Sequence, residues 1–490
     1  MAEHRQANTI LTRRSVLQRA GGVIAVAAFP AGAAIAAEPV SKVTTRLSTY
    51  MSEAASHALP AEVIEKTKHH ILDTFASMIS GAELPPGKVA IRFARARAGE
   101  KVATVVASDV VCGPIEAAMA NGMLAHSDET DDYAPVGTHP GSAVVPAALA
   151  AGEQFGVDGT RFLRATALGY DIGSRVAWTL GGQALNYEGH KSIHSVSGVF
   201  GAGAAAGCTA SLNAQQMRWI LDYAAQQASG IAAWQRDTEH IEKGFVFAGM
   251  PARSGVTAAL LIQLGATGVD DILSGADNFL MAYAPQANPE TLVEKLGERY
   301  DVTLTSIKKW TVGGPMQAAL DAMEILLKRH HFEPDQVQQV TVRLGPRMGE
   351  VVNNREMPDI CVQHMLAVML IDKTASFAAA HDKPRMQDPA VLRQRAKVQL
   401  VFDASIERDT EQREAIVEVV LAGGDHLREH VTIVRGRPEN PMSRDEVVAK
   451  CRDLITPVLG ASTSAKLIAR VLDLENLKNI RELRPLLQPT

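Results

Sequence analysis

The sequence predicts a mainly α-helical protein with a smaller α+β domain, because the spacing of apolar residues changes twice along the chain. From about residue 40 to 276, apolar residues recur at helical spacing and Ala and Gly are frequent. Between about 336 and 436 the period changes to two, as in strands. Beyond 441 the helical spacing returns. Helices, then strands with helices, then helices again argue against a doubly wound parallel sheet.

The chain length predicts two domains. A chain of 490 residues exceeds the roughly 250 to 300 residues at which single cores stop growing. We expect a helical domain built from residues 38–276 and 441–490, because the last helices are expected to return to the first ones, and an α+β domain over 277–440. We expect no nucleic-acid partner, because the net charge is −5 and the Lys and Arg residues form no basic cluster with aromatic residues.

The N-terminal residues 1–37 differ from the rest and resemble a bacterial twin-arginine export signal. Arg13 and Arg14 precede an apolar stretch over residues 20–36 that ends in a small-residue cleavage pattern. Glycines and Pro30 interrupt this stretch, which makes it poor at spanning about 30 Å of hydrocarbon. We therefore expect a periplasmic bacterial protein. We expect the mature chain to be soluble, because no later segment has about 18 uninterrupted apolar residues.

Local patterns predict the individual elements of the second half of the chain. The alternating runs QVQQVTVRLG, AKVQLVFD and AIVEVVLAGGDHLREHVTIVRG predict mostly antiparallel strands, with a turn at 423–425. Helical spacing predicts helices over 316–329 and 362–380. A capping box of Ser443 and Glu446 opens the final helical stretch.

The cysteines and one glycine-rich run carry no cofactor signature. The four cysteines lie far apart without a CxxC spacing, so we expect them to be small buried hydrophobic residues: Cys112, Cys208, Cys361 and Cys451. Residues 201–207, GAGAAAG, superficially match a dinucleotide fingerprint. No strand precedes them and the last spacing is wrong, so they predict a tightly packed helix.

The most distinctive stretch is residues 126–142, HSDETDDYAPVGTHPGS. His139 precedes a predicted helix start with Ser142 as its N-cap, and helix starts present unpaired N–H groups to anions. Crowded carboxylates and a neighbouring imidazole tune one another's pKa, which suits an acid–base site. The alternatives are a solvated loop and a metal site. The calcium-loop glycine and an HExxH motif are both missing, which disfavours metal.

Four further segments carry ionisable residues. His190 and His194, four residues apart, suit either a metal or two unrelated histidines. Lys243 and Arg253 flank an apolar patch. Two more segments precede helix starts, and their charged residues are Lys308, Lys309, Arg355, Asp359 and His364. Histidines, carboxylates and cations at helix starts together predict a pocket for a small polyanion that undergoes proton transfer.

Several of these segments together resemble the MmgE/PrpD family. They are HSDETDDYAPVGTHPGS, IHSVSGVFGAGAAA, EKGFVFAGMPARSGV, IKKWTVGGPMQAALDA and MPDICVQHMLAVMLIDKT, and the resemblance covers nearly all of the mature chain. Members of the family include 2-methylcitrate dehydratase, cis-aconitate decarboxylase and an iminodisuccinate epimerase. The resemblance implies a large helical domain built from both ends of the chain, with the smaller α+β domain as a lid. It further implies a homodimer and chemistry without a metal or organic cofactor. It also implies proton transfer at a carbon next to a carboxylate.

The resemblance also implies roles for particular residues. His139 and His194 match the acid and base candidates of the family. Lys243 and Lys308 match the residues that bind substrate carboxylates, with Lys309 as a one-residue alternative, and we include Arg253 with them.

The loop itself departs from the family pattern. Asp131 and Asp132 are retained and are expected to take part in catalysis. Glu129 replaces an aspartate and Tyr133 replaces a threonine that helps to shape the pocket, so both are expected to contact substrate. These two departures leave the substrate open.

The resemblance favours a cofactor-independent lyase, a dehydratase or decarboxylase, that acts on a small di- or tricarboxylate. One alternative is an epimerase or isomerase of a dicarboxylate that uses the same two-base site. The other is a non-catalytic periplasmic polycarboxylate-binding protein.

Overall fold

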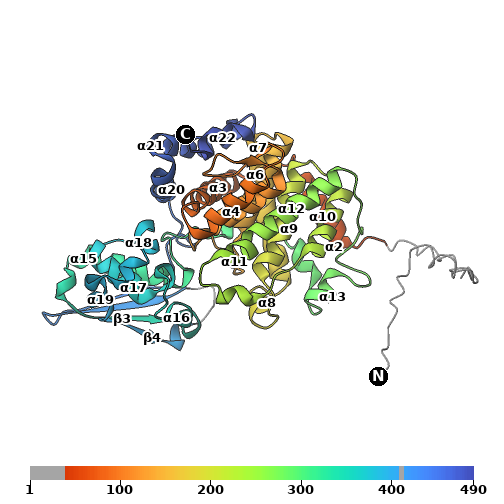
Figure 1. The fold of residues 1–490 in the computed structure, drawn as a ribbon. Coiled ribbons are helices and arrows are strands. Elements are labelled where there is room, and N and C mark those ends of the chain that lie inside the picture. The colour runs from red at the N-terminus through yellow and green to blue at the C-terminus, as the bar shows by residue number, and fades with distance from the viewer. Residues whose placement is uncertain (1–38, 408–412, 490) are drawn as a thin grey trace, which may run out of the picture. The chain divides into compact units, whose positions relative to one another are not determined.

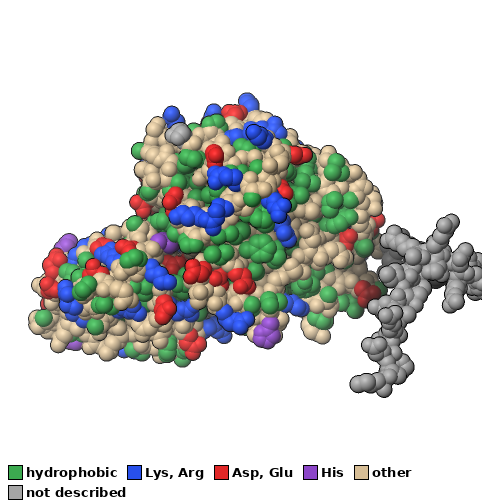
Figure 2. Space-filling view, in the orientation of Figure 1, with side chains coloured by type: hydrophobic (Ala, Val, Ile, Leu, Met, Phe, Trp, Pro, Cys, Tyr) green, Lys and Arg blue, Asp and Glu red, His purple; other side chains and the backbone are tan. Residues whose placement is uncertain are grey.

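The computed structural model describes residues 39–407 and 413–489, and within them the predicted fold class is confirmed. The predicted signal peptide over 1–37 lies outside the described residues, so export stays a prediction, as does the homodimer. Helices make up most of the described chain, and a small sheet lies in its second half (Figure 1). On the face seen in Figure 2, basic and acidic side chains of the described residues are interspersed.

Between residues 39 and 270, the helical domain contains nine helices of twelve residues or more. They are α2 (Lys42–Glu53), α3 (Ala61–Gly81), α4 (Pro85–Ala96), α5 (Pro114–Ala125), α6 (Pro140–Phe155), α7 (Gly159–Thr179), α9 (Ile193–Thr209), α10 (Ala214–Gln227) and α12 (Met250–Gln263). Shorter elements connect them: strands β1 (Ala103–Thr104) and β2 (Val111–Cys112), and helices α8 (Ala184–Tyr187) and α11 (Ile241–Gly244).

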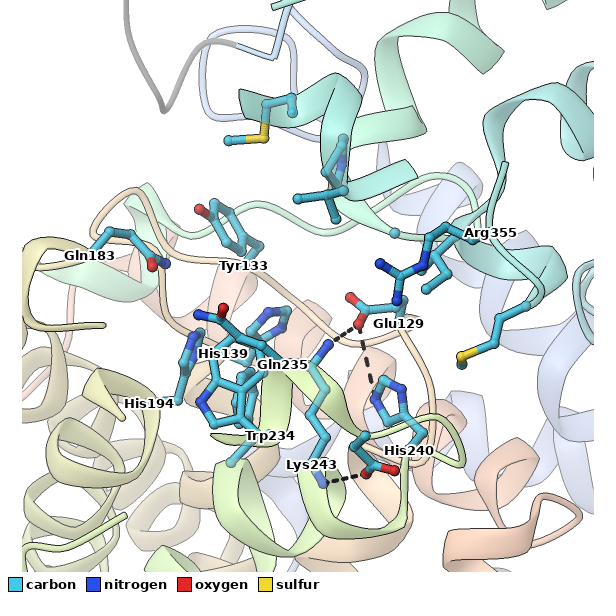
Figure 3. Close-up of a pocket in the computed structure, with 18 of the residues that line it drawn as sticks. Glu129, Tyr133, His139, Gln183, His194, Trp234, Gln235, His240, Lys243 and Arg355 are labelled. Atoms are coloured by element: carbon cyan, nitrogen blue, oxygen red, sulfur yellow. Dashed lines mark hydrogen bonds and ion pairs between the residues drawn. The ribbon is translucent and has the colours of Figure 1, made fainter. Parts of the chain in front are cut away.

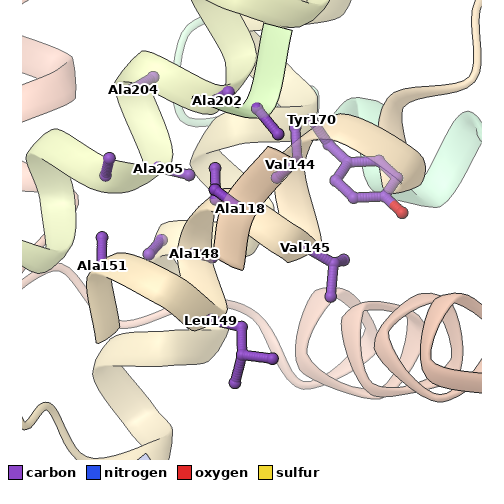
Figure 4. Packing of buried hydrophobic residues seen from close by; sticks show 14 of the residues in the cluster. Ala118, Val144, Val145, Ala148, Leu149, Ala151, Tyr170, Ala202, Ala204 and Ala205 are labelled. Atoms are coloured by element: carbon purple, nitrogen blue, oxygen red, sulfur yellow. The ribbon is translucent and has the colours of Figure 1, made fainter. Parts of the chain in front are cut away.

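Helix α9 lies at the centre of this domain. It packs against α6, α7, α10 and α12, and every one of its residues is buried. Figure 4 shows Val144 and Ala148 of α6 close to Ala202 and Ala205 of α9. The glycine-rich run makes this packing possible, since a Cβ at Gly201 would lie only 2.7 Å from a backbone oxygen of α7. The tightly packed helix predicted for this run is therefore confirmed.

The C-terminal helices return to the helical domain, as predicted. Helix α20 (Arg444–Leu459) begins with the predicted capping box, and α20 and α21 (Ala461–Leu472) pack on α3. In Figure 1 these two helices, in blue, lie beside α3, in red-orange. The short helix α22 (Arg484–Leu487) follows them. Both ends of the described chain thus share one hydrophobic core.

The lid domain has its own core around a four-stranded sheet. Its strands run in the order β4–β3–β5–β6, with the β3–β4 pair parallel and the other pairs antiparallel. The strands are β3 (Val337–Leu344), β4 (Val398–Phe402), β5 (Ala415–Leu421) and β6 (His426–Val431). Helices α15 (Gln317–His330) and α17 (Val362–Asp372) pack on the sheet, and α16 (Pro346–Val352), α18 (Phe377–His381) and α19 (Pro389–Arg395) complete the domain.

The structure corrects the domain boundary predicted at residue 277. The segment with α13 (Phe279–Tyr283) and α14 (Asp301–Leu304) packs into the core of the helical domain, and the lid core begins only at Trp310. The buried guanidinium of Arg175 holds this segment by donating hydrogen bonds to its backbone carbonyls. Short irregular turns have no apolar period, so the sequence pattern did not assign them to the larger core.

Two further expectations have clear outcomes. The helix predicted over 362–380 is divided into α17 and α18, because Lys373 adopts a left-handed conformation with φ of 62° that ends α17. All four cysteines are buried and free, as predicted.

Among the described helices, one stretch, Ile241–Gln263, is long and apolar enough to cross a membrane, but 67% of its most apolar window is buried inside the protein.

Candidate active site

A cavity of about 300 Å³ lies where the 126–142 loop, the start of α9, residues 234–247 and the lid domain meet. Figure 3 shows the side chains of His139, His194 and Trp234 on one side of it, and Tyr133 and Arg355 across from them. The volume is at the lower end of the range for small-molecule pockets. Several of the residues that the sequence singled out therefore converge on one cavity.

His139 is the N-cap residue of α6, where Pro140 begins the helix. This corrects the prediction that Ser142 is the N-cap: Ser142 is the third helical residue, and its hydroxyl donates to the His139 carbonyl. The His139 ring lines the cavity, and its Nδ1 lies 3.1 Å from Oδ1 of Asp131.

Burial lowers the pKa of His139 to about 4, although the Asp131 charge opposes this shift. The imidazole is therefore neutral at pH 7. We assign its proton to Nδ1, because Asp131 accepts the hydrogen bond there. Nε2 then carries the free lone pair, which is the arrangement that a general base requires.

Asp131 is fully buried and orients two histidines. Its Oδ2 lies 2.8 Å from Nδ1 of His126, in addition to the contact of Oδ1 with His139. Burial alone would raise the pKa of Asp131, but His126 and His139 outweigh burial and hold the pKa well below its usual range. The carboxylate is therefore ionised and fixes the tautomer and orientation of His139.

Asp132 lies behind the cavity and does not line it. It accepts hydrogen bonds from the Tyr170 hydroxyl at 2.5 Å, from His70 Nδ1 at 2.9 Å and from the Gly141 backbone N–H at 3.1 Å. These contacts tie the start of α6 to α3 and α7. The predicted catalytic position of Asp132 is thus corrected to one that supports the helix start bearing His139.

His194 is the second residue of α9 and faces His139 across the cavity, with 5.5 Å between the ring centroids. Its ring stacks on Phe247 at 3.7 Å, and its buried Nδ1 has no hydrogen-bond partner among the described residues. Burial, and then the neighbouring His139, hold the pKa of His194 well below its usual value. By contrast, His190 is exposed, precedes the helix and adopts φ of 53°, so the two histidines share no helix face.

Glu129 forms the centre of a charged group at the edge of the cavity. It pairs with Lys243, and its Oε2 lies 3.7 Å from Nζ of Lys308. Burial would raise the pKa of Glu129, but the charges of Lys243 and Lys308 outweigh it and hold the pKa well below its usual range. Figure 3 shows Lys243, Glu129 and His240 as neighbours.

The structure settles which of the two adjacent lysines lies near the site. Lys308 is buried behind Glu129, where its ammonium donates to the Glu129 carbonyl at 2.7 Å, and it does not line the main cavity. Lys309 instead pairs with Glu324 of the lid domain at 2.5 Å. Lys308 is therefore placed to hold the loop, and Lys243 is the lysine that meets the cavity.

Two other predicted substrate contacts have different outcomes. Arg253 is exposed and lies 5.9 Å from the Phe245 ring, away from the cavity, so its predicted binding role is not supported by its position. Tyr133 lines the cavity, and its ring lies edge-on to His139 at 5.4 Å. A backbone bridge between Tyr133 and Ser306 fixes the loop there.

The sequence patterns missed several lining or supporting residues. Those missed are His126, Trp234, His240, Arg347 and Arg413. His126 is the first residue of the 126–142 stretch, but no sequence pattern assigned it a role. The arginines belong to the lid and are brought in only by folding. Of the candidates between residues 355 and 364, Arg355 lines the cavity, whereas Asp359, and His364 in α17, do not.

The buried histidines and carboxylates include groups of metal-ligand type. Side-chain atoms of His126, Asp131 and His139, and of His126, Glu129 and His240, lie within 4.8 Å of one another. In the structure Asp131 is occupied by hydrogen bonds from two histidines, and Glu129 by the two lysines. Hydrogen bonds and ion pairs thus satisfy both carboxylates, which favours a role in tuning the histidines.

The low pKa of His139 is directly testable. In a histidine-labelled sample, NMR titration should give a midpoint near pH 4 for His139, well below the unperturbed value of about 6.5. The charge of Asp131 raises this pKa, so Asp131→Asn should move the midpoint further down. Circular dichroism defines the pH range in which the fold persists. A protonated His139 at pH 6 in the intact fold would contradict this assignment.

The fold and the cavity define a two-domain protein in which helix starts present two neutral histidines to a pocket beneath an α+β lid. The chain belongs to the MmgE/PrpD family, as the sequence resemblance indicated. Residues 45–292 match the MmgE/PrpD N-terminal domain, and residues 310–476 match the MmgE/PrpD C-terminal domain.

Similar proteins span almost the same length. The cis-aconitate decarboxylase-like protein oryM of Aspergillus oryzae is 25% identical over 490 residues, which cover 92% of this chain and 98% of that protein. The cis-aconitate decarboxylase of Aspergillus terreus is 26% identical over 482 residues, which cover 91% of this chain and 96% of that protein.

Proposed function

We propose that this protein is a lyase that dehydrates or decarboxylates a small di- or tricarboxylate without a cofactor. The observation that carries the proposal is the free Nε2 of His139, whose Nδ1 is held by Asp131, at a cavity with an excess of cations. Among residues 39–407 and 413–489, four cations line the cavity against two carboxylates. They are Lys243, Arg347, Arg355 and Arg413, against Glu129 and Asp237.

The excess of positive charge matches a substrate with several carboxylates. Cations beside a substrate carboxylate stabilise the negative charge that develops when a proton leaves the adjacent carbon. His139 is the group that takes this proton. The imidazolium of His139 that results holds the proton that can then protonate the leaving group or the product carbon. The neutral His194, with its ring centroid 5.5 Å from that of His139, is placed to orient the substrate by a hydrogen bond.

The relatives support the lyase class. Both are named as cis-aconitate decarboxylases or decarboxylase-like, and they align over more than nine-tenths of this chain. Identities of 25% and 26% support the class of reaction and leave the substrate open. The replacements at Glu129 and Tyr133 point to a substrate that differs from those of better-known members.

The experiment that tests the proposal is a substrate screen. The purified protein is incubated in D₂O with unsaturated and hydroxylated polycarboxylates, and products are followed by proton NMR. We expect loss of water or carbon dioxide from at least one of them. Deuterium entry into recovered substrate without elimination would replace the lyase by an epimerase. Binding without any turnover or exchange would favour the non-catalytic alternative.

A further inference from the structure

Three arginines of the lid domain line the cavity without an acidic partner. Within residues 39–407 and 413–489, no hydrogen bond or ion pair joins the guanidinium groups of Arg347, Arg355 or Arg413 to a carboxylate. Lys243, on the opposite domain, is already paired with Glu129. Cations in a partly buried cavity without a counter-charge are typical of sites that receive an anionic group.

Arg413 is held in place by an aromatic ring. Its guanidinium carbon lies 3.8 Å from the centroid of the Tyr133 ring, a stacked cation–π contact. Its buried Nε has no acceptor among the described residues. Stacking fixes the plane of a guanidinium and leaves its N–H edge available for a carboxylate.

A glycine makes room for this arginine. A Cβ built on Gly314 would lie 1.3 Å from Nη1 of Arg413 and 2.2 Å from its Cζ. The backbone of Gly314 is not in the left-handed region, so the missing side chain matters here for space alone. The Arg413 guanidinium therefore occupies a position that any larger residue at 314 would close.

The arginines lie near the acid–base centre. The Tyr133 ring that stacks on Arg413 also meets the His139 ring at 5.4 Å. Arg347 lies 5.8 Å from the Tyr187 ring, which lines the same cavity. Figure 3 shows Arg355 and Tyr133 across the cavity from His194 and Trp234. The helical domain thus contributes Lys243 to the cavity, and the lid domain contributes the three arginines.

We infer that Arg413, together with Arg347 and Arg355, forms a second carboxylate-binding subsite on the lid, so that the site binds dicarboxylates more tightly than monocarboxylates. The inference rests on the proposed function for the first carboxylate, which the helical-domain side of the cavity receives. Tyr133 and Gly314 are positioning residues in this subsite. The replacement of threonine by Tyr133 then belongs with Arg413, because the ring is the surface on which the guanidinium stacks.

Calorimetric binding of two inert ligands tests the subsite. Glutarate and pentanoate share a five-carbon chain and differ by one carboxylate. The full chain should bind glutarate more tightly. Arg413→Gln should weaken glutarate binding by about 10- to 100-fold, because a charged hydrogen bond to its second carboxylate is lost. It should change pentanoate binding by less than about threefold, because pentanoate can still place its single carboxylate on the other side of the cavity.

Gly314→Ala provides an independent test that keeps the arginine. Its Cβ displaces the flexible end of Arg413, so it should reproduce most of the loss in glutarate binding. In the Arg413→Gln background the same substitution should have no further effect, since coupled residues are not additive. Arg393→Gln, at an exposed arginine of α19, is the matched control and should leave both affinities unchanged.

The outcomes separate this subsite from the proposed function. If Arg413→Gln leaves the ratio of the two affinities as in the parent, or lowers both equally, the subsite is wrong even if turnover is found. If the ratio falls as expected but no polycarboxylate is turned over, the subsite stands and the lyase proposal fails. If the parent binds neither ligand at millimolar concentration, the subsite is overturned.

Discussion

Replacing His139 by Asn should lower kcat by about 10²- to 10⁴-fold, the usual contribution of a general acid or base. The expected loss follows from the free Nε2, which an asparagine amide does not replace because it does not take up a proton near neutral pH. Asn still donates a hydrogen bond toward Asp131, so the buried carboxylate keeps a partner at this position. The measurement is the steady-state rate on the substrate that the screen identifies.

His190→Asn is the matched control for this prediction. His190 is exposed and adopts φ of 53°, a conformation that Asn tolerates well, and it lies outside the cavity. Its replacement should leave kcat within about twofold, since exposed substitutions away from a site have small effects. A His139→Asn variant that is folded by circular dichroism and keeps more than a tenth of the parental kcat would exclude His139 as the proton-transfer residue.

Replacing Lys450 by Met should destabilise the protein by about 3–5 kcal/mol, the cost of leaving a buried charge without its partner. Lys450 Nζ lies 2.6 Å from Oδ1 of Asp73, and both side chains are buried. The same ammonium donates to the Thr130 carbonyl at 3.1 Å, inside the catalytic loop. Unfolding in urea, followed by circular dichroism, gives the difference in free energy.

The loss should grow as pH rises. Burial raises the pKa of Asp73, although Lys450 opposes this shift, so removing the lysine raises the pKa further. A raised pKa in the folded state means that the folded form holds the proton more strongly than the unfolded form does. The stability contributed by that proton is present at low pH and is lost as pH rises through the folded pKa. Lys450→Met should therefore be less destabilising at pH 5 than at pH 8.

Two controls isolate the buried pair. The double variant Asp73→Asn with Lys450→Met removes the uncompensated charge and should recover part of the lost free energy, so the two substitutions are not additive. Lys466→Met, at an exposed lysine of α21, should change the free energy of unfolding by less than about 0.5 kcal/mol. If Lys450→Met cost less than about 1 kcal/mol at pH 8, the pair would not be holding α20 to α3.

Much of the fold was predictable because it is encoded locally. The change from a helical to a two-residue apolar period located the sheet, and the Ser443 and Glu446 pair located the start of α20. Between residues 277 and 307 the chain consists of short turns without a period, and there the prediction failed. These residues are placed by contacts such as those of Arg175 with backbone carbonyls, which lie more than a hundred positions away.

The candidate site was predicted less completely than the fold. The loop pattern singled out His139 and Asp131, and folding joins them directly by a hydrogen bond. It also singled out Asp132, which instead supports the helix start from behind. His126 carries no sequence signal of its own, because its importance comes from the through-space contact with Asp131.

The sequence by itself determined the family, the helical class, the domain order and the loop that carries the acid–base pair. Apolar periodicity and helix caps depend on residues within a few positions of each other, so they can be predicted from the amino-acid sequence alone. Only the tertiary structure decided that Lys308 and not Lys309 meets Glu129, that Arg253 faces away from the cavity and that Arg413 stacks on Tyr133. Ion pairs and stacking depend on which surfaces folding brings within a few ångströms, and sequence spacing does not carry that information.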